Sequence, residues 1–184
     1  MEDPELVKRV RQGDPSAFRE LFERHRRMVY NLAYRVTLHE EEALDVTQQV
    51  FVRLSEKIHL YDGQGCFRSW LSTMAVRMAI DRTRSKSRRE IPTSPEIFED
   101  RERVAGREGE SHPRAVLERR RTTERVAEAM EKLSAQQRAI LLLQLHEDLG
   151  PKEIAERLGL PAQQVRSQRA RGIEKLKKIL NPTP

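Results

Sequence analysis

Hydrophobic positions near the start of the chain repeat at the spacing of amphipathic helices. From Asp14 to Val36 apolar residues recur every three or four positions, as on a helix with one buried face. Asp14 followed by Pro15 provides an amino-terminal cap and first turn for this helix. A short first helix is predicted near Pro4 to Arg11. A further helix is predicted from about Glu40 to Ile58, with a buried stripe of Leu44, Phe51, Leu54 and Ile58.

A turn-forming segment ends this helical pattern. Residues 61–65 contain two glycines and an aspartate, which break a helix. Another helix is predicted to start near Phe67, with Trp70 and Leu71 on its apolar stripe. Residues 1–89 are therefore expected to form one bundle of about four helices.

The periodic pattern stops between residues 90 and 114. This stretch contains three prolines, two glycines, seven acidic residues and four arginines, for a net charge of −3. It is interpreted as an acidic flexible linker. Helical spacing resumes near Ala115, and Ser134 is expected to cap a helix over Gln136 to His146, so residues 115–184 form the second domain. Because period-two alternation is absent, we expect an all-α fold of two small helical domains joined by a flexible linker.

The strongest local motif lies in the second domain, over residues 151–171. It indicates a helix-turn-helix, in which Gly159 makes the turn, Pro161 opens the second helix and Val165 packs back onto the first. The second helix is expected to expose polar side chains that can hydrogen-bond base edges and phosphates. These are Gln163, Gln164, Arg166, Ser167, Gln168, Arg169 and Arg171.

Charge separates this chain from an ordinary helical protein. Its 184 residues include 35 Lys and Arg against 29 Asp and Glu, a net charge of +6. Residues 77–89 and residues 151–180 each carry a net charge of +5. Two separate basic segments suggest two contacts with polyanions.

Cysteine content and hydropathy indicate where the protein works. Cys66 is the only cysteine, so neither an internal disulfide nor a multi-cysteine zinc site is possible, which suits a reducing compartment. No run approaches the roughly 18 apolar residues of a membrane span, and the first residues do not resemble an export signal. We therefore expect a cytoplasmic protein without membrane insertion.

Aromatic residues beside arginines occur at residues 67–71, with the sequence FRSWL. Such residues can stack on single-stranded bases. Because Phe67 and Trp70 fall on the predicted core stripe, packing is the favoured interpretation for both. Tyr61 and Gln64 in the preceding loop, together with the basic helix face, are better candidates for contacts with nucleic acid.

Five motifs together resemble a known family. In order they are DVTQQVFVRL at residues 45–54, FRSWL at 67–71, AIDR at 79–82, LSAQQR at 133–138 and EIAERLG at 153–159. They resemble the extracytoplasmic-function, or group-four, sigma factors of bacterial RNA polymerase, over nearly the whole chain. The resemblance implies a transcription initiation factor whose amino-terminal domain, region two, binds the clamp of the largest polymerase subunit and opens the minus-ten promoter element. The carboxy-terminal domain, region four, would bind the flap of the second-largest subunit and read the minus-thirty-five element.

The resemblance also implies roles for individual residues. Polymerase binding would fall on Asp45, Gln48, Gln49 and Arg53. The melted minus-ten strand would meet Tyr61, Gln64, Arg77, Asp81 and Arg82. The minus-thirty-five groove would meet Gln163, Gln164, Arg166, Ser167, Arg169 and Arg171. The acidic linker would run toward the polymerase active centre, and an anti-sigma factor is an expected partner.

Certain positions depart from the family pattern. Arg77 stands where many members have asparagine, which predicts an unusual minus-ten preference. Gln168 replaces a frequent arginine and Ala170 a larger side chain. The minus-thirty-five sequence therefore cannot be transferred from a better-known relative.

Two other classes of function compete with this interpretation. A helix-turn-helix repressor with a sensory amino-terminal domain would share the carboxy-terminal motif, but would not need the DVTQ sequence at residues 45–48 or a basic helix. An enzyme is disfavoured because the five histidines lack metal-ligand spacing and the chain has neither a phosphate-cradling glycine loop nor a nucleophile motif. We expect no catalytic residue, metal or cofactor. Stoichiometric binding to core polymerase would distinguish a sigma factor from both alternatives.

Overall fold

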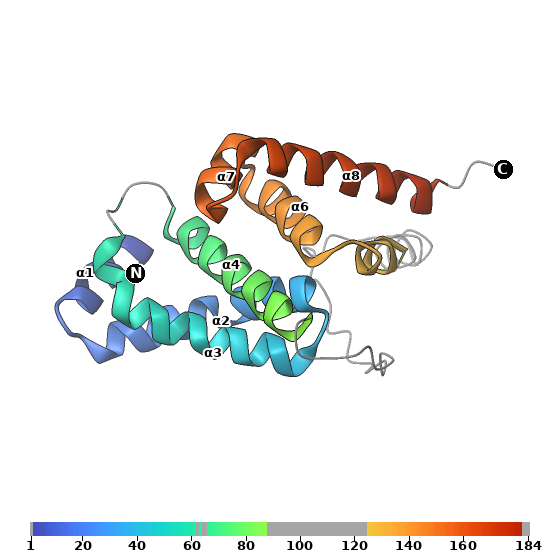
Figure 1. Cartoon of the computed structure of the whole chain (residues 1–184). Coiled ribbons are helices and arrows are strands. Elements are labelled where there is room, and N and C mark those ends of the chain that lie inside the picture. Colours follow the sequence, from blue (N-terminus) through green and yellow to red (C-terminus); the bar gives the residue numbers. More distant parts are fainter. Residues whose placement is uncertain (1, 62, 64–65, 88–124, 182–184) are drawn as a thin grey trace, which may run out of the picture.

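The computed structural model describes residues 2–61, 63, 66–87 and 125–181, whose regular secondary structure is entirely helical. The amino-terminal unit, residues 2–87, contains the first five elements, and the carboxy-terminal unit, residues 125–181, contains the others (Figure 1). The all-α prediction is confirmed. The elements are α1 (Asp3–Arg11), α2 (Pro15–Thr37), α3 (Glu40–Lys57), the 3-10 helix η1 (Ile58–Leu60), α4 (Phe67–Ser87), α6 (Ala135–Glu147), α7 (Pro151–Leu158) and α8 (Ala162–Leu180), and residues 125–131 are also helical.

Asp14 caps α2 as the sequence predicts. Its Oδ1 accepts hydrogen bonds from the backbone N–H groups of Ser16 at 2.8 Å and Ala17 at 3.3 Å. Its Oδ2 accepts from Arg9 Nη2 at 2.6 Å. The Ser16 hydroxyl, followed by Arg9, holds the pKa of the Asp14 carboxyl well below its ordinary value. The same carboxylate therefore starts α2 and ties it to α1.

The buried stripe of α3 differs from the prediction at one residue. Val46, Val50 and Leu54 are fully buried, whereas Leu44 is 47% exposed. The apolar part of the buried stripe starts at Ala43, and Leu44 lies about 100° further around the helix. The prediction for Leu44 is therefore wrong, while Phe51, Leu54 and Ile58 are buried as expected.

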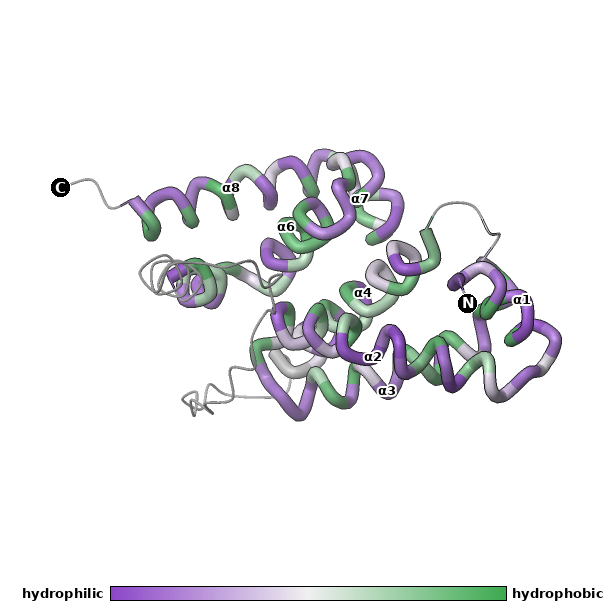
Figure 2. The backbone as a smooth tube through the Cα atoms, turned by 180° about the vertical axis from the view of Figure 1, so that it is seen from behind, coloured by the Kyte–Doolittle hydropathy of each residue, from purple (hydrophilic) through white to green (hydrophobic). Residues whose placement is uncertain are grey.

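Helix α4 is covered on two sides. It packs against α2 and α3 on one side and against α6 and α7 on the other (Figure 1). Its apolar residues Phe67, Leu71 and Ala75 are buried, and so are its small polar residues Ser69 and Thr73. The colouring of Figure 2 shows hydrophobic stretches in α4 and α6, but mostly hydrophilic positions along α8.

The carboxy-terminal unit contains the predicted cap and turn. Ser134 and Gln137 form a capping box at the start of α6. Helices α7 and α8 are joined through Gly159, whose φ of +64° lies in the left-handed region that glycine adopts without a steric penalty. Val165 is fully buried, as the helix-turn-helix prediction requires. The predicted linker, residues 90–114, and the predicted start of the second domain at residue 115 lie outside the described residues.

Two arginines of the carboxy-terminal unit hold it against the amino-terminal unit. Arg138 Nε and Nη2 donate to the carbonyl oxygen of Val36, near the end of α2, at 3.1 and 2.6 Å. Burial lowers the pKa of Arg138 to about 10, so its guanidinium stays charged at neutral pH. Arg157 of α7 donates to the hydroxyl oxygens of Ser69 and Thr73 on α4.

A histidine contributes a third contact between the units. Arg35 Nη1 of α2 donates to Nε2 of His146 on α6 at 2.8 Å, so Nε2 must carry a lone pair and the ring is neutral. The residue is exposed, but partial desolvation of the ring, followed by the charges of Arg35 and Arg68, lowers the pKa of His146, whereas Glu147 acts in the opposite direction. The contact thus requires the unprotonated imidazole.

Substitution of Leu143 with alanine should destabilise the fold far more than the same change at Leu145. Leu143 is 1% exposed and Leu145 is 76% exposed on the same helix, so only the first substitution leaves a cavity. We expect Leu143→Ala to lower the free energy of unfolding by about 2–5 kcal/mol, and Leu145→Ala to change it by about 0.5 kcal/mol or less. Urea unfolding followed by circular dichroism measures both, and equal effects would contradict the assigned burial.

Acidification should weaken the contact between the two units. Because the pKa of His146 in the packed form lies below the ordinary value of 6.5, the contact is fully favourable above that pH and is lost as the pH falls below it. Small-angle scattering across this range should show expansion of the wild type. His146→Gln retains an acceptor for Arg35 but does not titrate, so its dimensions should not respond to the same acidification, and an equal response would show that another group titrates.

Candidate functional site

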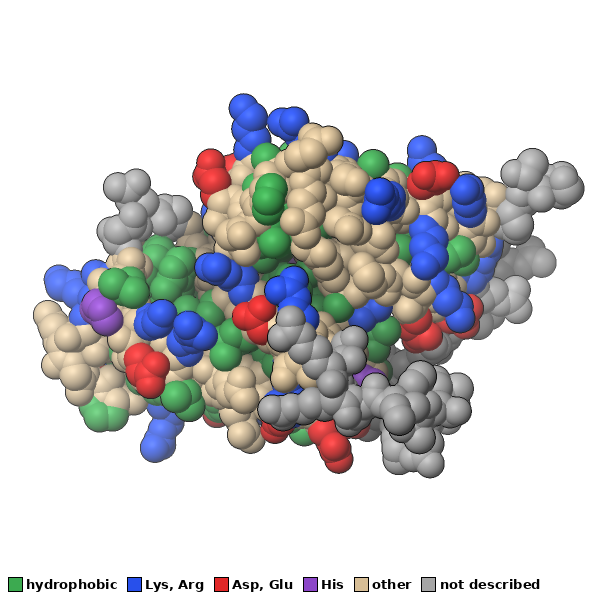
Figure 3. All heavy atoms as spheres, in the orientation of Figure 1, with side chains coloured by type: hydrophobic (Ala, Val, Ile, Leu, Met, Phe, Trp, Pro, Cys, Tyr) green, Lys and Arg blue, Asp and Glu red, His purple; other side chains and the backbone are tan. Residues whose placement is uncertain are grey.

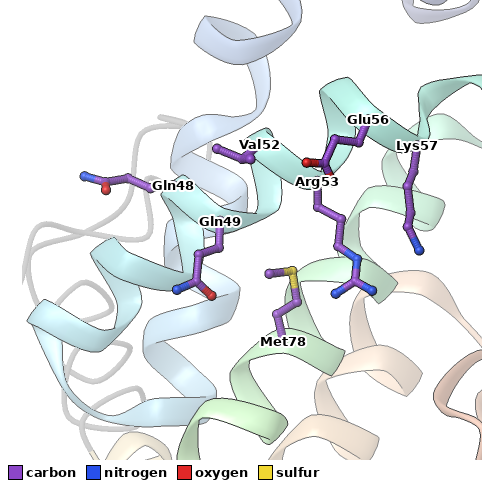
Figure 4. Close-up of a pocket in the computed structure, with 7 residues that line it drawn as sticks. All are labelled: Gln48, Gln49, Val52, Arg53, Glu56, Lys57 and Met78. Atoms are coloured by element: carbon purple, nitrogen blue, oxygen red, sulfur yellow. The ribbon is translucent and has the colours of Figure 1, made fainter.

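The outer face of α3 exposes the residues predicted to bind polymerase. Asp45, Gln48, Gln49 and Arg53 are all exposed. Val52 lies among them and is 61% exposed. A groove runs along this face, with Met78 of α4 on its other side. Figure 4 shows Gln49 and Arg53 extending from α3 toward α4, whereas Gln48 points away. A single exposed apolar side chain is ordinary on a protein surface, so the candidate interface rests on the combination of amide, charged and apolar groups along this groove.

An ion pair links this face to the helix predicted to meet DNA. Arg82 Nη2 of α4 lies 2.8 Å from Asp45 Oδ2, and the two side chains are 40% and 50% exposed. Exposed ion pairs of this kind contribute about 0–1 kcal/mol. Arg82 can therefore exchange the Asp45 carboxylate for a phosphate at little cost.

The predicted minus-ten residues are in different environments. Arg77 and Asp81 are exposed and lie one turn apart on α4. Tyr61 is only 4% exposed, and its ring packs against Phe67 and Trp70 at centroid distances of 5.5 and 5.6 Å. Gln64 lies outside the described residues.

The burial of Tyr61 corrects the prediction that its ring is available to DNA in this conformation. Its position directly after η1 turns the ring into the aromatic cluster, whereas the turn-like composition around it suggests exposure. Phe67 is 2% exposed, as its assignment to packing predicts. A contact of Tyr61 with DNA would require the loop to rearrange.

The outer face of α8 exposes three of the residues predicted to meet the minus-thirty-five groove. Gln163, Arg166 and Arg171 are exposed, while Gln164 and Ser167 are half-buried. Val165 and Gly172 are buried on the opposite side. Arg169 is also half-buried, and its Nε donates to Gln144 Oε1 of α6 at 2.6 Å. Five of the six predicted residues therefore remain as candidates for the outer surface, and Arg169 turns inward.

Basic side chains lie on both units. On the face shown in Figure 3, Lys and Arg side chains stand over the amino-terminal unit below and the carboxy-terminal unit above. Near the end of α8, Lys178 and Glu174 form an ion pair at 2.9 Å, and their hydrogen bond lowers the pKa of Glu174 and raises that of Lys178. Such basic surfaces suit nucleic acid.

The turn of the helix-turn-helix lies against the candidate minus-ten surface. A side-chain carbon added at Gly159 would lie 3.2 Å from Arg77 Nη2. Arg157, two residues earlier, binds Ser69 and Thr73 on α4. The sequence pattern predicts no role for Ser69, Thr73, Arg138 or Arg157, because a contact between distant segments leaves no local pattern.

The described residues contain no group of three or more His, Cys, Asp or Glu side chains that could hold a metal ion. In the same part of the chain, no helix is both long enough and apolar enough to cross a membrane.

Comparisons with known proteins agree with the two helical units. Residues 21–89 match the family described as Sigma-70 region 2, and residues 123–176 match Sigma-70, region 4. The chain is 30% identical to the RNA polymerase sigma-H factor of Pseudomonas aeruginosa over 185 residues, covering 98% of this chain and 95% of that protein. It is 29% identical to the extracytoplasmic-function (ECF) RNA polymerase sigma factor SigW of Bacillus subtilis, covering 95% and 94% of the two chains.

Solved structures share the fold. The sigma factor RpoE in complex with the anti-sigma factor NepR from Bartonella quintana has a TM-score of 0.63 at 15% identity, covering 91% of this chain and 98% of that one. CnrH in complex with the cytosolic domain of CnrY has a TM-score of 0.58 at 22% identity, covering 99% of each chain. Region 2 and region 4 match in order, and the relatives align over nearly their whole length. The chain therefore belongs to the sigma-70 family as an extracytoplasmic-function RNA polymerase sigma factor, which is a non-enzymatic protein of promoter recognition and transcription initiation.

Proposed function

We propose that this sigma factor binds core RNA polymerase through the outer face of α3, meets the minus-ten element with α4 and reads the minus-thirty-five element with α8. The observation that carries the proposal is the separation of three exposed polar surfaces onto three helices of two helical units. Each surface has the side chains that its partner requires.

The α3 surface suits a protein partner better than DNA. Gln48 and Gln49 supply amide donors and acceptors, Val52 an apolar contact and Arg53 a charge. This mixture resembles the rim and centre of a protein interface. We assign it to the clamp of the largest polymerase subunit, and we assign the flap of the second-largest subunit to the carboxy-terminal unit.

The α4 surface suits a melted strand. Arg77 and Arg82 can meet phosphates, while Asp81 can accept a hydrogen bond from a base edge. The aromatic cluster of Tyr61, Phe67 and Trp70 supports the segment where the loop joins α4. Because residue 77 is an arginine and not a neutral amide, we expect binding of the minus-ten strand to depend more strongly on phosphate contacts.

The α8 surface suits the major groove. Gln163 and Ser167 lie on the side of the helix opposite buried Val165, and exposed Arg166 and Arg171 flank them. This arrangement places amide and hydroxyl groups toward base edges and guanidinium groups toward guanines or phosphates on either side.

Both promoter elements can be bound together only after the two units separate. The elements are about 25 base pairs apart, or roughly 85 Å of duplex at 3.4 Å per base pair. In this structure α4 and α8 belong to units in direct contact through Arg138 and Arg157. We infer that binding to polymerase parts the units, and that the free protein binds promoter DNA poorly.

The proposed partners also include an anti-sigma factor. The solved RpoE structure contains the anti-sigma factor NepR, and this similarity supports a partner of the same kind here. We place the protein in the cytoplasm, where core polymerase is found, and propose that the acidic segment at residues 90–114 follows the path of nucleic acid toward the polymerase active centre.

The direct test is transcription by bacterial core polymerase on a library of promoter fragments, with and without this protein. We expect new start sites that depend on the protein and share two upstream elements. Arg53→Glu should reduce both the stable complex with core polymerase and the dependent transcripts, because it reverses a charge on the α3 face. Glu23→Ala, an exposed change on α2, is the control. Absence of any complex and any dependent transcript would overturn the sigma-factor function.

Arg171→Ala should weaken recognition of the minus-thirty-five element by about 1–3 kcal/mol if the guanidinium reads a base. A phosphate contact would instead reduce binding to all promoters to a similar extent. Transcription from promoters varied at each minus-thirty-five position separates the two results, with Arg26→Ala on α2 as the matched arginine control. Unchanged binding and unchanged specificity would remove Arg171 from the DNA surface.

A further inference from the structure

Two side-chain hydrogen bonds join the recognition helix α8 to α6. Arg169 Nε donates to Gln144 Oε1 at 2.6 Å, and Gln137 Nε2 donates to Gln168 Oε1 at 3.1 Å. On α8, the donor Arg169 and the acceptor Gln168 are consecutive residues. Their partners on α6 are seven residues apart, or about 10 Å along that helix. The recognition helix is thus held at two separated points of the helix beneath it.

One of these bonds continues into the cap of α6. The side-chain oxygen of Gln137 accepts from the backbone N–H of Ser134 at 3.1 Å, while the side-chain nitrogen of the same amide binds Gln168. The cap therefore fixes which end of the Gln137 amide faces α8. A chain of hydrogen bonds runs from the start of α6 to the recognition helix.

Helices α6 and α8 also pack closely beside these bonds. A side-chain carbon added at Gly172 would lie 3.4 Å from Leu141 Cδ1 and 3.6 Å from Gln137 Cβ, so the two helices approach closely there. Apolar packing such as that of Leu141 beside Gly172 holds the helices together, but apolar attraction is non-directional. Hydrogen bonds weaken steeply when misaligned, and these two can therefore fix the rotation of α8 about its own axis.

We propose that Gln144 and Gln137 are positioning residues that set the rotation of the recognition helix, and hence which base edges Gln163 and Ser167 meet. Arg169 then acts through Gln144 and does not read DNA. The inference rests on the proposed binding of α8 to the minus-thirty-five element. It replaces the predicted role of Arg169 with a contact inside the carboxy-terminal unit.

We expect loss of these bonds to reduce promoter selectivity more than binding to polymerase. Base-edge hydrogen bonds require placement within about 0.5 Å and 10–20°, so a small rotation weakens contacts that remain present. The bonds to α6 lie on the inner side of α8, away from its exposed face, and involve no residue of the α3 surface. Their loss should leave binding to polymerase intact.

The test compares variants of the full-length protein in transcription with core polymerase on promoters randomised at the minus-thirty-five element. Gln144→Leu keeps the bulk and removes the acceptor, and Gln144→Glu restores an acceptor for Arg169. We expect Gln144→Leu to reduce discrimination between promoters by about fivefold or more, the lower end of what one well-placed base contact provides. Gln144→Glu should retain the wild-type preference, and Gln12→Leu, at an exposed glutamine after α1, is the matched control.

Arg169→Met provides an independent variant. If Arg169 acts through Gln144, then Arg169→Met, Gln144→Leu and the double variant should all show the same altered preference, because the substitutions remove one interaction. If Arg169 reads a base, only the variants that lack Arg169 should lose a preference, at one base pair. That result would overturn the positioning role.

The remaining outcomes are also decisive. The positioning role would be overturned if Gln144→Leu kept the wild-type promoter preference, or if it reduced transcription equally on all promoters. In either case, dependent transcripts from the wild type would still support the sigma-factor function. A wild type without dependent transcripts would instead overturn the proposed function itself. Circular dichroism and capture by core polymerase verify that each variant is folded.

Discussion

The arrangement of the two units depends on the buried guanidinium of Arg138. It binds the carbonyl oxygen of Val36 near the end of α2 and that of Leu133 just before α6, and only 6% of the residue is exposed. The end of a helix carries partial negative charge and unpaired carbonyl groups, so α2 provides a site for a cation. Through this contact the cap region of α6 is fixed against α2, and α7 follows against α4.

The position of α4 between the two units explains why its sequence pattern is hard to interpret. A helix buried on one side shows one apolar stripe, and Phe67, Leu71 and Ala75 form such a stripe against α2 and α3. Ser69 and Thr73 look like surface positions on that basis, but α7 covers them and Arg157 binds both hydroxyl groups. Local patterns predicted where α4 begins, whereas its second buried side depends on a helix more than sixty residues later.

Features set by neighbouring residues were predictable, and those set by helix rotation were not. The caps at Asp14 and Ser134, the turn at Gly159 and the exposed face of α3 follow from contacts within a few residues. The prediction for Leu44 is wrong because one residue corresponds to about 100° around a helix. The prediction for Tyr61 is wrong because the composition of its loop does not show that the ring turns into the core. Arg169 belongs with these cases, since only the packing of α8 on α6 shows that it turns inward.

The contacts between the units differ from those inside each unit in a way that permits separation. Arg138, Arg157 and Arg35 bind carbonyl, hydroxyl and imidazole acceptors, and hydrogen bonds to charged groups contribute about 1.5–3 kcal/mol each. Water can replace these acceptors when the units part, although apolar contacts between α4 and α6 add to the cost. The cap of α6 and the turn before α8 lie entirely within the carboxy-terminal unit. Separation therefore preserves the recognition helix while it exposes Ser69 and Thr73 and moves the Gly159 turn away from Arg77 of α4.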